Sequence, residues 1–456
     1  MIYLHENGIT VVANDEAKRG KVYELNGEKY YVARSVSDIK KIISSKEYPL
    51  NRVVTTKLTS LNGLFEIQSY GQSAVPSDYS EDLTNWDTSN VITMEEVFCG
   101  WPEFNQDISN WDTSMVESMH GMFKSSKYVG SYHIGKTYFN QDISNWDVSN
   151  VKNMSEMFMG ATSFNQDIST WDVSNVENMS HMFSGAVSFN QSIGNWNVSN
   201  VKNMCGMFSD TEAIGIKAFV GSYEYRRAGS SSFNQPIGNW NVGNVENMDY
   251  MFSGATSFNQ DISNWNVSNV TTMVHMFSGG RKDALVETYS TENTVKNNPT
   301  SFNQPIENWD VSNVESMENM FREATAFNQP IGNWNVSKVG NMGGMFREAT
   351  AFNQDLNGWN ISSLSWVEDM FYGATSFNSP IGNWKLKPTS SQSNDNSGIS
   401  SMKNMFREAI AFNQDISSWD VSSVINMSEM FMGATSFNQD ISGWDVSNVI
   451  QMKGLF

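Results

Sequence analysis

A 25-residue repeat is the feature that most constrains the fold of this 456-residue chain. Aligned on tryptophan, the unit reads F-N-Q-x-I-x-x-W-x-V-S-x-V-x-x-M-x-x-M-F-x-x-A-x-x. A unit of this length buries its apolar side only against its neighbours, so the period predicts stacked repeats rather than about three ordinary domains. The thirteen repeat tryptophans are Trp86, Trp111, Trp146, Trp171, Trp196, Trp240, Trp265, Trp309, Trp334, Trp359, Trp384, Trp419 and Trp444.

The spacing of the apolar residues changes along each unit. Trp146 and Val148 alternate with polar residues, which is the period of a β-strand. Met154, Met157 and Phe158 follow at spacings of three and four residues, which is the period of a helical turn. The pattern predicts an α/β solenoid, in which a parallel sheet of one short strand per repeat is backed by helical turns. We expect the tryptophan in the core, with a partner for its indole N–H within the repeat.

The first residues of the chain differ from the repeats. Residues 1–49 are typical of a small α+β capping module, with a hairpin turn at Asn26-Gly27 and a helix over 35–44 that starts with a serine cap. Residues 50–78 fit a degenerate first repeat with an insertion, and the tryptophan repeats occupy residues 79–456. Further insertions lie near residues 124–138, 209–232, 278–301 and 388–398.

The charge and the cysteine count limit the partners and the kinds of site. The chain has 29 Lys and Arg against 49 Asp and Glu, a net charge of -20 that repels a polyanion, so we expect no nucleic-acid partner. Its two cysteines, Cys99 and Cys205, exclude a disulfide framework and a cysteine-based zinc cluster. The sequence as given shows no signal peptide and no apolar run of about 18 residues, so we expect no direct membrane insertion.

The carboxyl end falls in the middle of a repeat, at Phe456 and just after the methionine element. An open end of a solenoid exposes an apolar layer, and such ends are normally covered. We therefore expect a monomer whose carboxyl end is covered by missing sequence or by another chain.

The repeat FNQxIxxWDVSNVxxMxxMF resembles that of the BspA-type leucine-rich-repeat surface proteins, especially the bacterial branch in mycoplasma lipoproteins and marine flavobacteria. The likeness covers residues 79–456 almost without gaps. It implies a leucine-rich-repeat-like solenoid, an extracellular or cell-surface location, and adhesion to a partner. The resemblance supplies no catalytic residue.

Polar residues recur as strictly as the apolar ones. The amides that follow each repeat phenylalanine are expected to form ladders that satisfy backbone groups. The residue after each tryptophan is expected to point outward, and stacked carboxylates there repel one another. Either hydrogen bonds from neighbouring serines and backbone offset this repulsion, or Ca²⁺ binds between the carboxylates. The calcium candidates are Asp87, Asp112, Asp147 and Asp172.

The insertions supply the candidates for partner binding. Two of them share the phrase Val-Gly-Ser-Tyr among aromatic and basic residues, a composition typical of binding hot spots, although such loops also pack against their own rim. The repeat of Trp384 is a further irregular copy, because its outward residues are lysines. The candidates are Tyr128, Tyr132, Tyr223, Tyr225, Arg226, Arg227, Lys385 and Lys387.

No histidine lies in a metalloprotease motif or beside a nucleophile signature, so we expect no enzyme and no cofactor other than the possible calcium. The favoured hypothesis is a bacterial adhesion scaffold that contacts a protein or polysaccharide through its polar sheet face and edge loops. Two alternatives stay open. One is a glycan-active enzyme with tryptophan platforms and paired carboxylates, and the other is a purely structural spacer or stalk.

Overall fold

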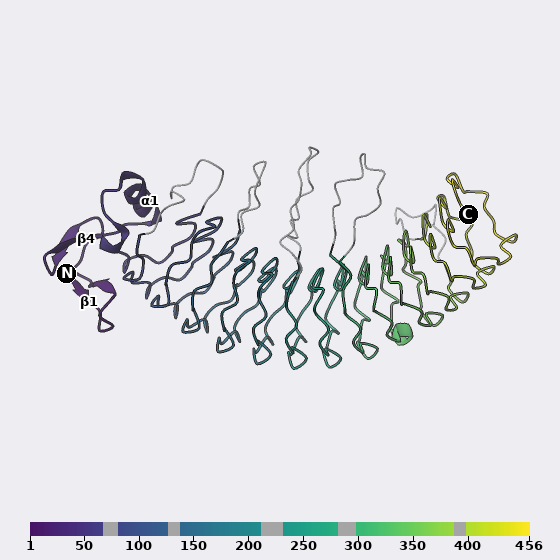
Figure 1. Cartoon of the computed structure of the whole chain (residues 1–456), viewed down its shortest axis with the longest axis horizontal. Coiled ribbons are helices and arrows are strands. Elements are labelled where there is room, and N and C mark those ends of the chain that lie inside the picture. The colour runs from purple at the N-terminus through teal and green to yellow at the C-terminus, as the bar shows by residue number, and fades with distance from the viewer. Residues whose placement is uncertain (67–80, 126–136, 211–230, 281–297, 387–397) are drawn as a thin grey trace. The chain divides into compact units, whose positions relative to one another are not determined.

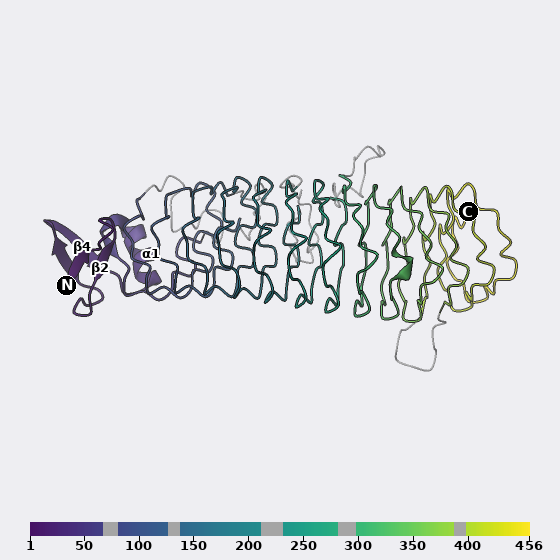
Figure 2. The ribbon, with the colours of Figure 1, turned by 90° about the horizontal axis from the view of Figure 1, so that it is seen from below.

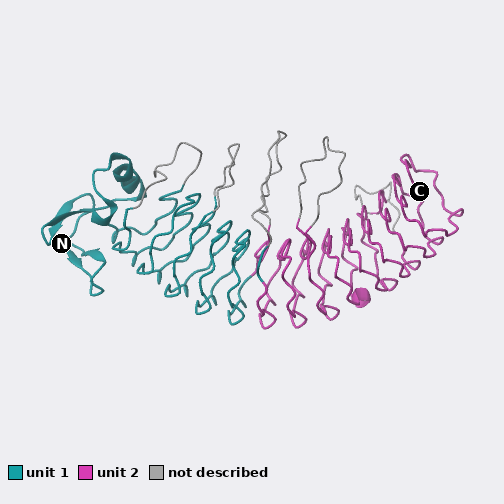
Figure 3. Cartoon of the chain, in the orientation of Figure 1, with its two compact units in different colours: residues 1–201, 212–233 teal, residues 202–211, 234–456 magenta. Residues whose placement is uncertain are grey.

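The computed structural model describes residues 1–66, 81–125, 137–210, 231–280, 298–386 and 398–456. Their contacts group into two compact units (Figure 3). Unit 1 comprises residues 1–201 and 212–233, and unit 2 comprises residues 202–211 and 234–456. Within each unit, successive repeats are similar turns of the chain that lie side by side (Figures 1 and 2).

Unit 1 begins with five short strands (Figure 1). The strand β1 (Ile2–Leu4) pairs antiparallel with β2 (Val11–Ala13), and β3 (Val22–Leu25) pairs antiparallel with β4 (Glu28–Val32). The strand β5 (Val53–Val54) lies parallel to β4. Apolar side chains of β1, β2, β4 and β5 are buried in one cluster, so this module has a small core of its own.

The predicted hairpin and helix of this module are both confirmed. The turn between β3 and β4 is Asn26-Gly27, with φ of 51° and 81°. These left-handed values are those of the tight turn that an Asn-Gly pair favours. The helix α1 (Val36–Ser45) starts after Ser35, whose side chain accepts a hydrogen bond from the backbone N–H of Asp38 at 3.2 Å. The serine cap therefore satisfies one of the unpaired donors of the first turn.

The repeats of each unit are joined through the segment that carries the two methionines. Met154, Glu156 and Phe158 each donate a backbone N–H to a carbonyl of the next repeat, over 2.8–2.9 Å. Parallel bridges join the residue before the first methionine to its counterpart in the neighbouring repeat, as Asn153 is joined to Asn178. Alternate residues bond in this way, which is the pattern of a parallel strand.

The strand-like pairing therefore lies in the segment that was expected to be a helical turn, and the expected strand at Trp146 carries no such bridge in the described residues. The residue before the second methionine explains the difference, because its backbone is left-handed, with φ of 59° at Glu156 and 58° at Gly121. A single left-handed residue interrupts an α-helix. The described part of the repeats has short 3-10 helices at η1 (Leu50–Arg52) and η2 (Ile331–Asn333).

The repeat aromatic residues form the core of each unit, as expected. The thirteen repeat tryptophans are at most 9% exposed. The ring of Phe158 stacks on that of Phe183 in the next repeat, with centroids 5.6 Å apart. The indole N–H of Trp171 donates to the carbonyl of Ile143 at 3.1 Å. This partner lies in the preceding repeat and not in the same repeat, so each such tryptophan links two repeats by a hydrogen bond as well as by packing.

The expected amide ladder runs beside this core. Asn328 Oδ1 accepts hydrogen bonds from the backbone N–H of Asn353 and from Nε2 of Gln354, both at 2.9 Å. The backbone N–H of Asn328 donates in turn to Oδ1 of Asn303 at 2.9 Å. The amides therefore satisfy backbone groups at the turns, which is a structural role.

Candidate functional site

The bridged segment of unit 2 presents one row of half-buried to exposed side chains, which we call the ladder face. It consists of the bridge residues and of the residues two positions after them, since alternate residues of an extended chain point to the same side. The residues of unit 2 that form the parallel bridges are Asn203, Asn247, Thr272, Ser316, Asn341, Trp366, Ser401, Asn426 and Gln451. All of them are polar except Trp366.

Trp366 is the most unusual residue of the ladder face. It is 63% exposed, whereas no repeat tryptophan exceeds 9%. The sequence analysis missed it because only tryptophans in phase with the repeat were considered. Its register was the available signal. In the other repeats a polar residue stands directly before the first methionine, whereas in this repeat Trp366 stands directly before Val367, which replaces that methionine.

Each repeat contributes one rung to the ladder face, namely its bridge residue and the residue two positions after it. The rung that precedes the rung of Trp366 has little side-chain bulk. Trp366 pairs with Asn341 in a parallel bridge, and its backbone N–H donates to the carbonyl of Gly340 at 3.2 Å. Gly343 takes the place two residues after Asn341, where other repeats carry a side chain. Gly343 therefore places no side chain beside Asn341 on the ladder face.

Polar groups held by hydrogen bonds occupy the positions next to Trp366 on the ladder face. Asn341 Nδ2 donates to Oε2 of Glu318 at 2.9 Å, and Asn341 Oδ1 accepts from the backbone N–H of Gly343 at 2.9 Å. Glu368, two residues after Trp366, accepts a hydrogen bond from the hydroxyl of Ser401 in the next rung. An aromatic ring thus lies among amide and carboxylate groups whose orientations are held by hydrogen bonds, which suits recognition of a ligand rather than covalent chemistry.

A second polar cluster in unit 2 comes from the Phe-Arg-Glu-Ala version of the repeat. The guanidinium groups of Arg347 and Arg407 lie 4.2 Å and 5.4 Å from the ring centroid of Tyr372. Arg322 Nε donates to Oε1 of Glu323 at 3.1 Å. Glu323 is 2% exposed, and among the described residues its Oε2 has no hydrogen-bond partner. Burial raises the pKa of this carboxyl above the usual value of 4.5.

Glu323→Gln is expected to change how stability depends on pH. Because its folded-state pKa is raised, Glu323 keeps its proton in the folded chain at a pH where the unfolded chain has lost it, so stability falls as pH rises from about 4.5 through the folded-state value. Glutamine does not ionise, so the variant lacks this loss of stability at high pH. In guanidinium unfolding, the variant should gain stability relative to the natural chain at pH 7, and the gain should shrink at pH 4.

The control for this prediction is Glu408→Gln, because the side chain of Glu408 is 52% exposed. It should change stability by less than about 0.5 kcal/mol at either pH. An equal gain at pH 4 and pH 7 for Glu323→Gln would contradict the assignment.

Three of the four calcium candidates are exposed, namely Asp112, Asp147 and Asp172. The expectation of an outward side chain is wrong for Asp87, which is 5% exposed. Thr55 of the first, degenerate repeat donates its hydroxyl to the backbone carbonyl of Asp87 at 2.9 Å.

Hydrogen bonds from serine offset the repulsion along this aspartate column. Asp112 Oδ1 accepts from the backbone N–H and the hydroxyl of Ser114, at 2.9 Å and 2.6 Å. The side chain and backbone N–H of Ser174 hold the pKa of Asp172 below its usual value. In the described part of the chain, no three His, Cys, Asp or Glu side chains are grouped as metal ligands.

The partner-binding candidates fall mainly outside the described residues. Only Lys385 among them belongs to the described part of the chain, where its side chain is exposed after the buried Trp384. The others lie outside it and are Tyr128, Tyr132, Tyr223, Tyr225, Arg226, Arg227 and Lys387.

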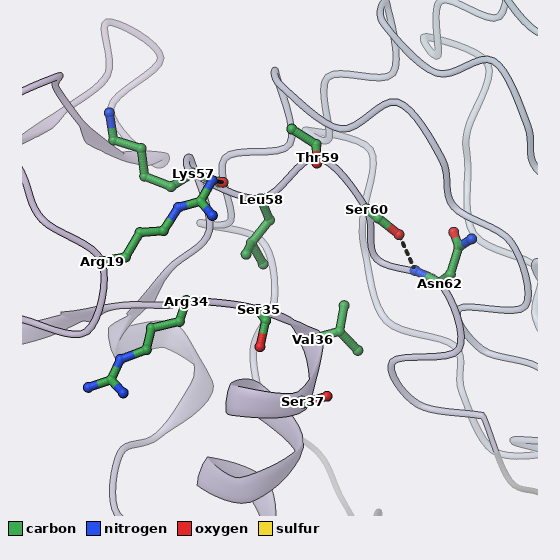
Figure 4. Close-up of a pocket in the computed structure, with 10 residues that line it drawn as sticks. All are labelled: Arg19, Arg34, Ser35, Val36, Ser37, Lys57, Leu58, Thr59, Ser60 and Asn62. Carbon is green, nitrogen blue, oxygen red and sulfur yellow. Dashed lines mark hydrogen bonds between the residues drawn. The ribbon is translucent and has the colours of Figure 1, made fainter.

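A pocket in the amino-terminal module is lined by basic and hydroxyl side chains (Figure 4). Its basic groups do not converge. The Arg19 guanidinium donates a hydrogen bond to the backbone carbonyl of Lys57. The Nζ of Lys57 lies 3.5 Å from a carboxylate oxygen of Asp15. Arg34 points away from both of them (Figure 4). This arrangement does not form an anion site.

The helices of the described residues are all too short or too polar to cross a membrane.

Comparison with known proteins places the repeats in a family. No curated protein matches the chain. One family model matches it in five stretches, residues 59–136, 130–219, 220–297, 289–394 and 390–456. These matches cover almost all of the sequence after the amino-terminal module. The chain is therefore a repeat protein that belongs to the family described as "Mycoplasma protein of unknown function, DUF285".

Proposed function

We propose that this chain is a non-enzymatic binding scaffold of the BspA-like, leucine-rich-repeat-like type, a solenoid displayed at the cell surface. Parallel bridges and stacked aromatic rings recur at the repeat spacing within each unit, which supports the stacked architecture. The scaffold contacts a protein or polysaccharide partner through its polar ladder face.

The exposed indole of Trp366 is the observation that carries this proposal. A spacer has no use for a tryptophan that is 63% exposed among otherwise polar bridge residues, whereas tryptophan is enriched among the residues that dominate binding energy. The repeat tryptophans are buried and hydrogen-bonded, so they do not serve as sugar platforms of an enzyme. The function therefore lies where the repeat is interrupted.

Adhesion of coated beads tests the proposal. Beads that carry the full chain settle on surfaces coated with mucin, with mucin stripped of its glycans, or with albumin. We expect retention on at least one mucin surface, competition by the soluble chain, and at least a tenfold loss with Trp366→Ala, because about 1.4 kcal/mol of binding energy corresponds to that factor.

The matched control is Ile410→Ala, which removes another exposed apolar side chain of unit 2 (49% exposed) and should leave retention unchanged. Retention on neither mucin surface, or equal retention of the Trp366→Ala beads, would overturn the proposed function.

A further inference from the structure

The ligand class follows from the chemistry around Trp366. An exposed indole offers a flat apolar surface, and it is rigid because its side chain has two rotatable bonds. Such a surface matches a partner that is itself flat and apolar on one side but polar at its edge. A pyranose ring has this form, because its C–H groups gather on one face and its hydroxyls project around the rim.

The groups beside the indole are suited to those hydroxyls. Glu368 lies two residues along the same extended segment, and Asn341 lies in the preceding rung, about 4.8 Å away at the spacing of parallel strands. A carboxylate accepts up to about four hydrogen bonds, so Glu368 has capacity beyond the one that Ser401 donates. Glu318 and Ser401 hold Asn341 and Glu368 in place, which lowers the entropy lost when a ligand binds.

The space beside the indole is also suited to a ring. Gly343 follows Asn341 on the ladder face of the preceding rung, and a side chain added there would first meet Oδ1 of Asn341, 3.3 Å away. A larger residue there would fill the surface next to the polar groups. Gly343 therefore leaves the surface next to Asn341 free for a sugar that also lies over the indole.

The charge of the surface selects among sugars. Two carboxylates, Glu318 and Glu368, belong to the ladder face near Trp366, and the chain as a whole carries a net charge of -20. Lys403, in the rung of Ser401, and Lys453, two residues after Gln451, are cations on the same row. An acidic glycan would be repelled by this field, whereas uncharged hydroxyl groups donate readily to carboxylates.

We propose that Trp366, Asn341 and Glu368 form a binding site for a neutral glycan, with a pyranose ring stacked on the indole and its hydroxyls bonded to the amide and the carboxylate. This inference rests on the proposed binding function and narrows it to one ligand class.

Affinity electrophoresis of the full chain tests this site. Native gels contain a β-glucan, a mannan or a galactomannan as neutral probes, or hyaluronan as an anionic probe. We expect at least one neutral polysaccharide to slow the natural chain and hyaluronan to leave it unaffected. Trp366→Ala should weaken the interaction about tenfold, Trp366→Phe should restore part of it, and Glu368→Gln should weaken it severalfold. Ile410→Ala should match the natural chain.

Three results would overturn the site: no retardation by any neutral probe, equal retardation of Trp366→Ala, or stronger retardation by hyaluronan. Unchanged melting temperatures would show that the variants are folded, as expected for substitutions at exposed positions. The bead experiment separates this inference from the proposed function. Trp366-dependent retention on glycan-free mucin would preserve a binding scaffold but replace the glycan by a protein partner.

Discussion

Trp265→Ala is expected to lower the free energy of unfolding of unit 2 by about 3–5 kcal/mol, the usual cost of removing a buried aromatic side chain. The indole of Trp265 is 3% exposed and stacks between Trp240 and Trp309, with centroids 6.4 Å from each. Its N–H donates to the carbonyl of Ile237 at 3.1 Å. The alanine variant leaves a cavity and removes that donor from a buried carbonyl, so two separate terms add to the loss.

Trp366→Ala is the matched control for this prediction, because the same side chain is removed from an exposed position of unit 2. It should change stability by no more than about 0.5 kcal/mol. Long repeat arrays do not always unfold in one step, so hydrogen exchange of the repeats around residues 240–309 complements guanidinium unfolding. Similar losses for the two variants would contradict the division between core and surface tryptophans.

The core was predictable from sequence because the spacing of the apolar residues alone shows which side chains are buried. Trp146 and Val148 share one side of a two-residue alternation, and both are buried, at 3% and 1% exposure. The amide ladder was predictable for a similar reason, since strictly repeated amides such as Asn328 are most simply explained by pairing between repeats. The partner of the indole N–H was not predictable from a single unit, because it lies in the preceding repeat.

The position of the strand-like segment was not predictable from apolar spacing. Met154 and Met157 have helical spacing. Glu156, directly before Met157, has a left-handed backbone with φ of 59°, which a helix does not allow. A left-handed glutamate gives no signal in a sequence. The signal was present in other copies, where Gly121 and Gly206 occupy the same place, and glycine there indicates a turn rather than a helix.

The candidate site shows the same limit. Trp366 was overlooked because it is out of phase with the thirteen repeat tryptophans, and the repeat pattern gives no indication of its exposure. Asp87 was misplaced because it is 5% exposed, whereas Asp112, Asp147 and Asp172 are exposed at the same place in later repeats. Periodicity predicts what each copy shares, whereas exposure at a single copy depends on the particular neighbours of that copy.

Gly254→Ala is expected to destabilise unit 2 by about 2–5 kcal/mol. The backbone at Gly254 has φ of 70°, which costs an L-residue about 1–2 kcal/mol. An added Cβ would also lie 1.9 Å from Cγ of Asp210, a buried residue of the neighbouring repeat. Relief of that overlap adds about 1–3 kcal/mol. The left-handed backbone alone is tolerated at this place in the repeat, since Glu323 and Glu348 occupy it with φ of 59°.

Gly8→Ala separates the two terms, because Gly8 has φ of 71° and nothing lies within 4 Å of an added Cβ. Guanidinium unfolding of the full chain should show a loss of about 1–2 kcal/mol for Gly8→Ala, the backbone term alone. A double-mutant cycle isolates the overlap. In an Asp210→Gly background, Gly254→Ala should cost no more than Gly8→Ala, because the overlapping carboxylate is gone. If Gly254→Ala costs the same with and without Asp210, steric contact between neighbouring repeats is not what requires glycine at this position.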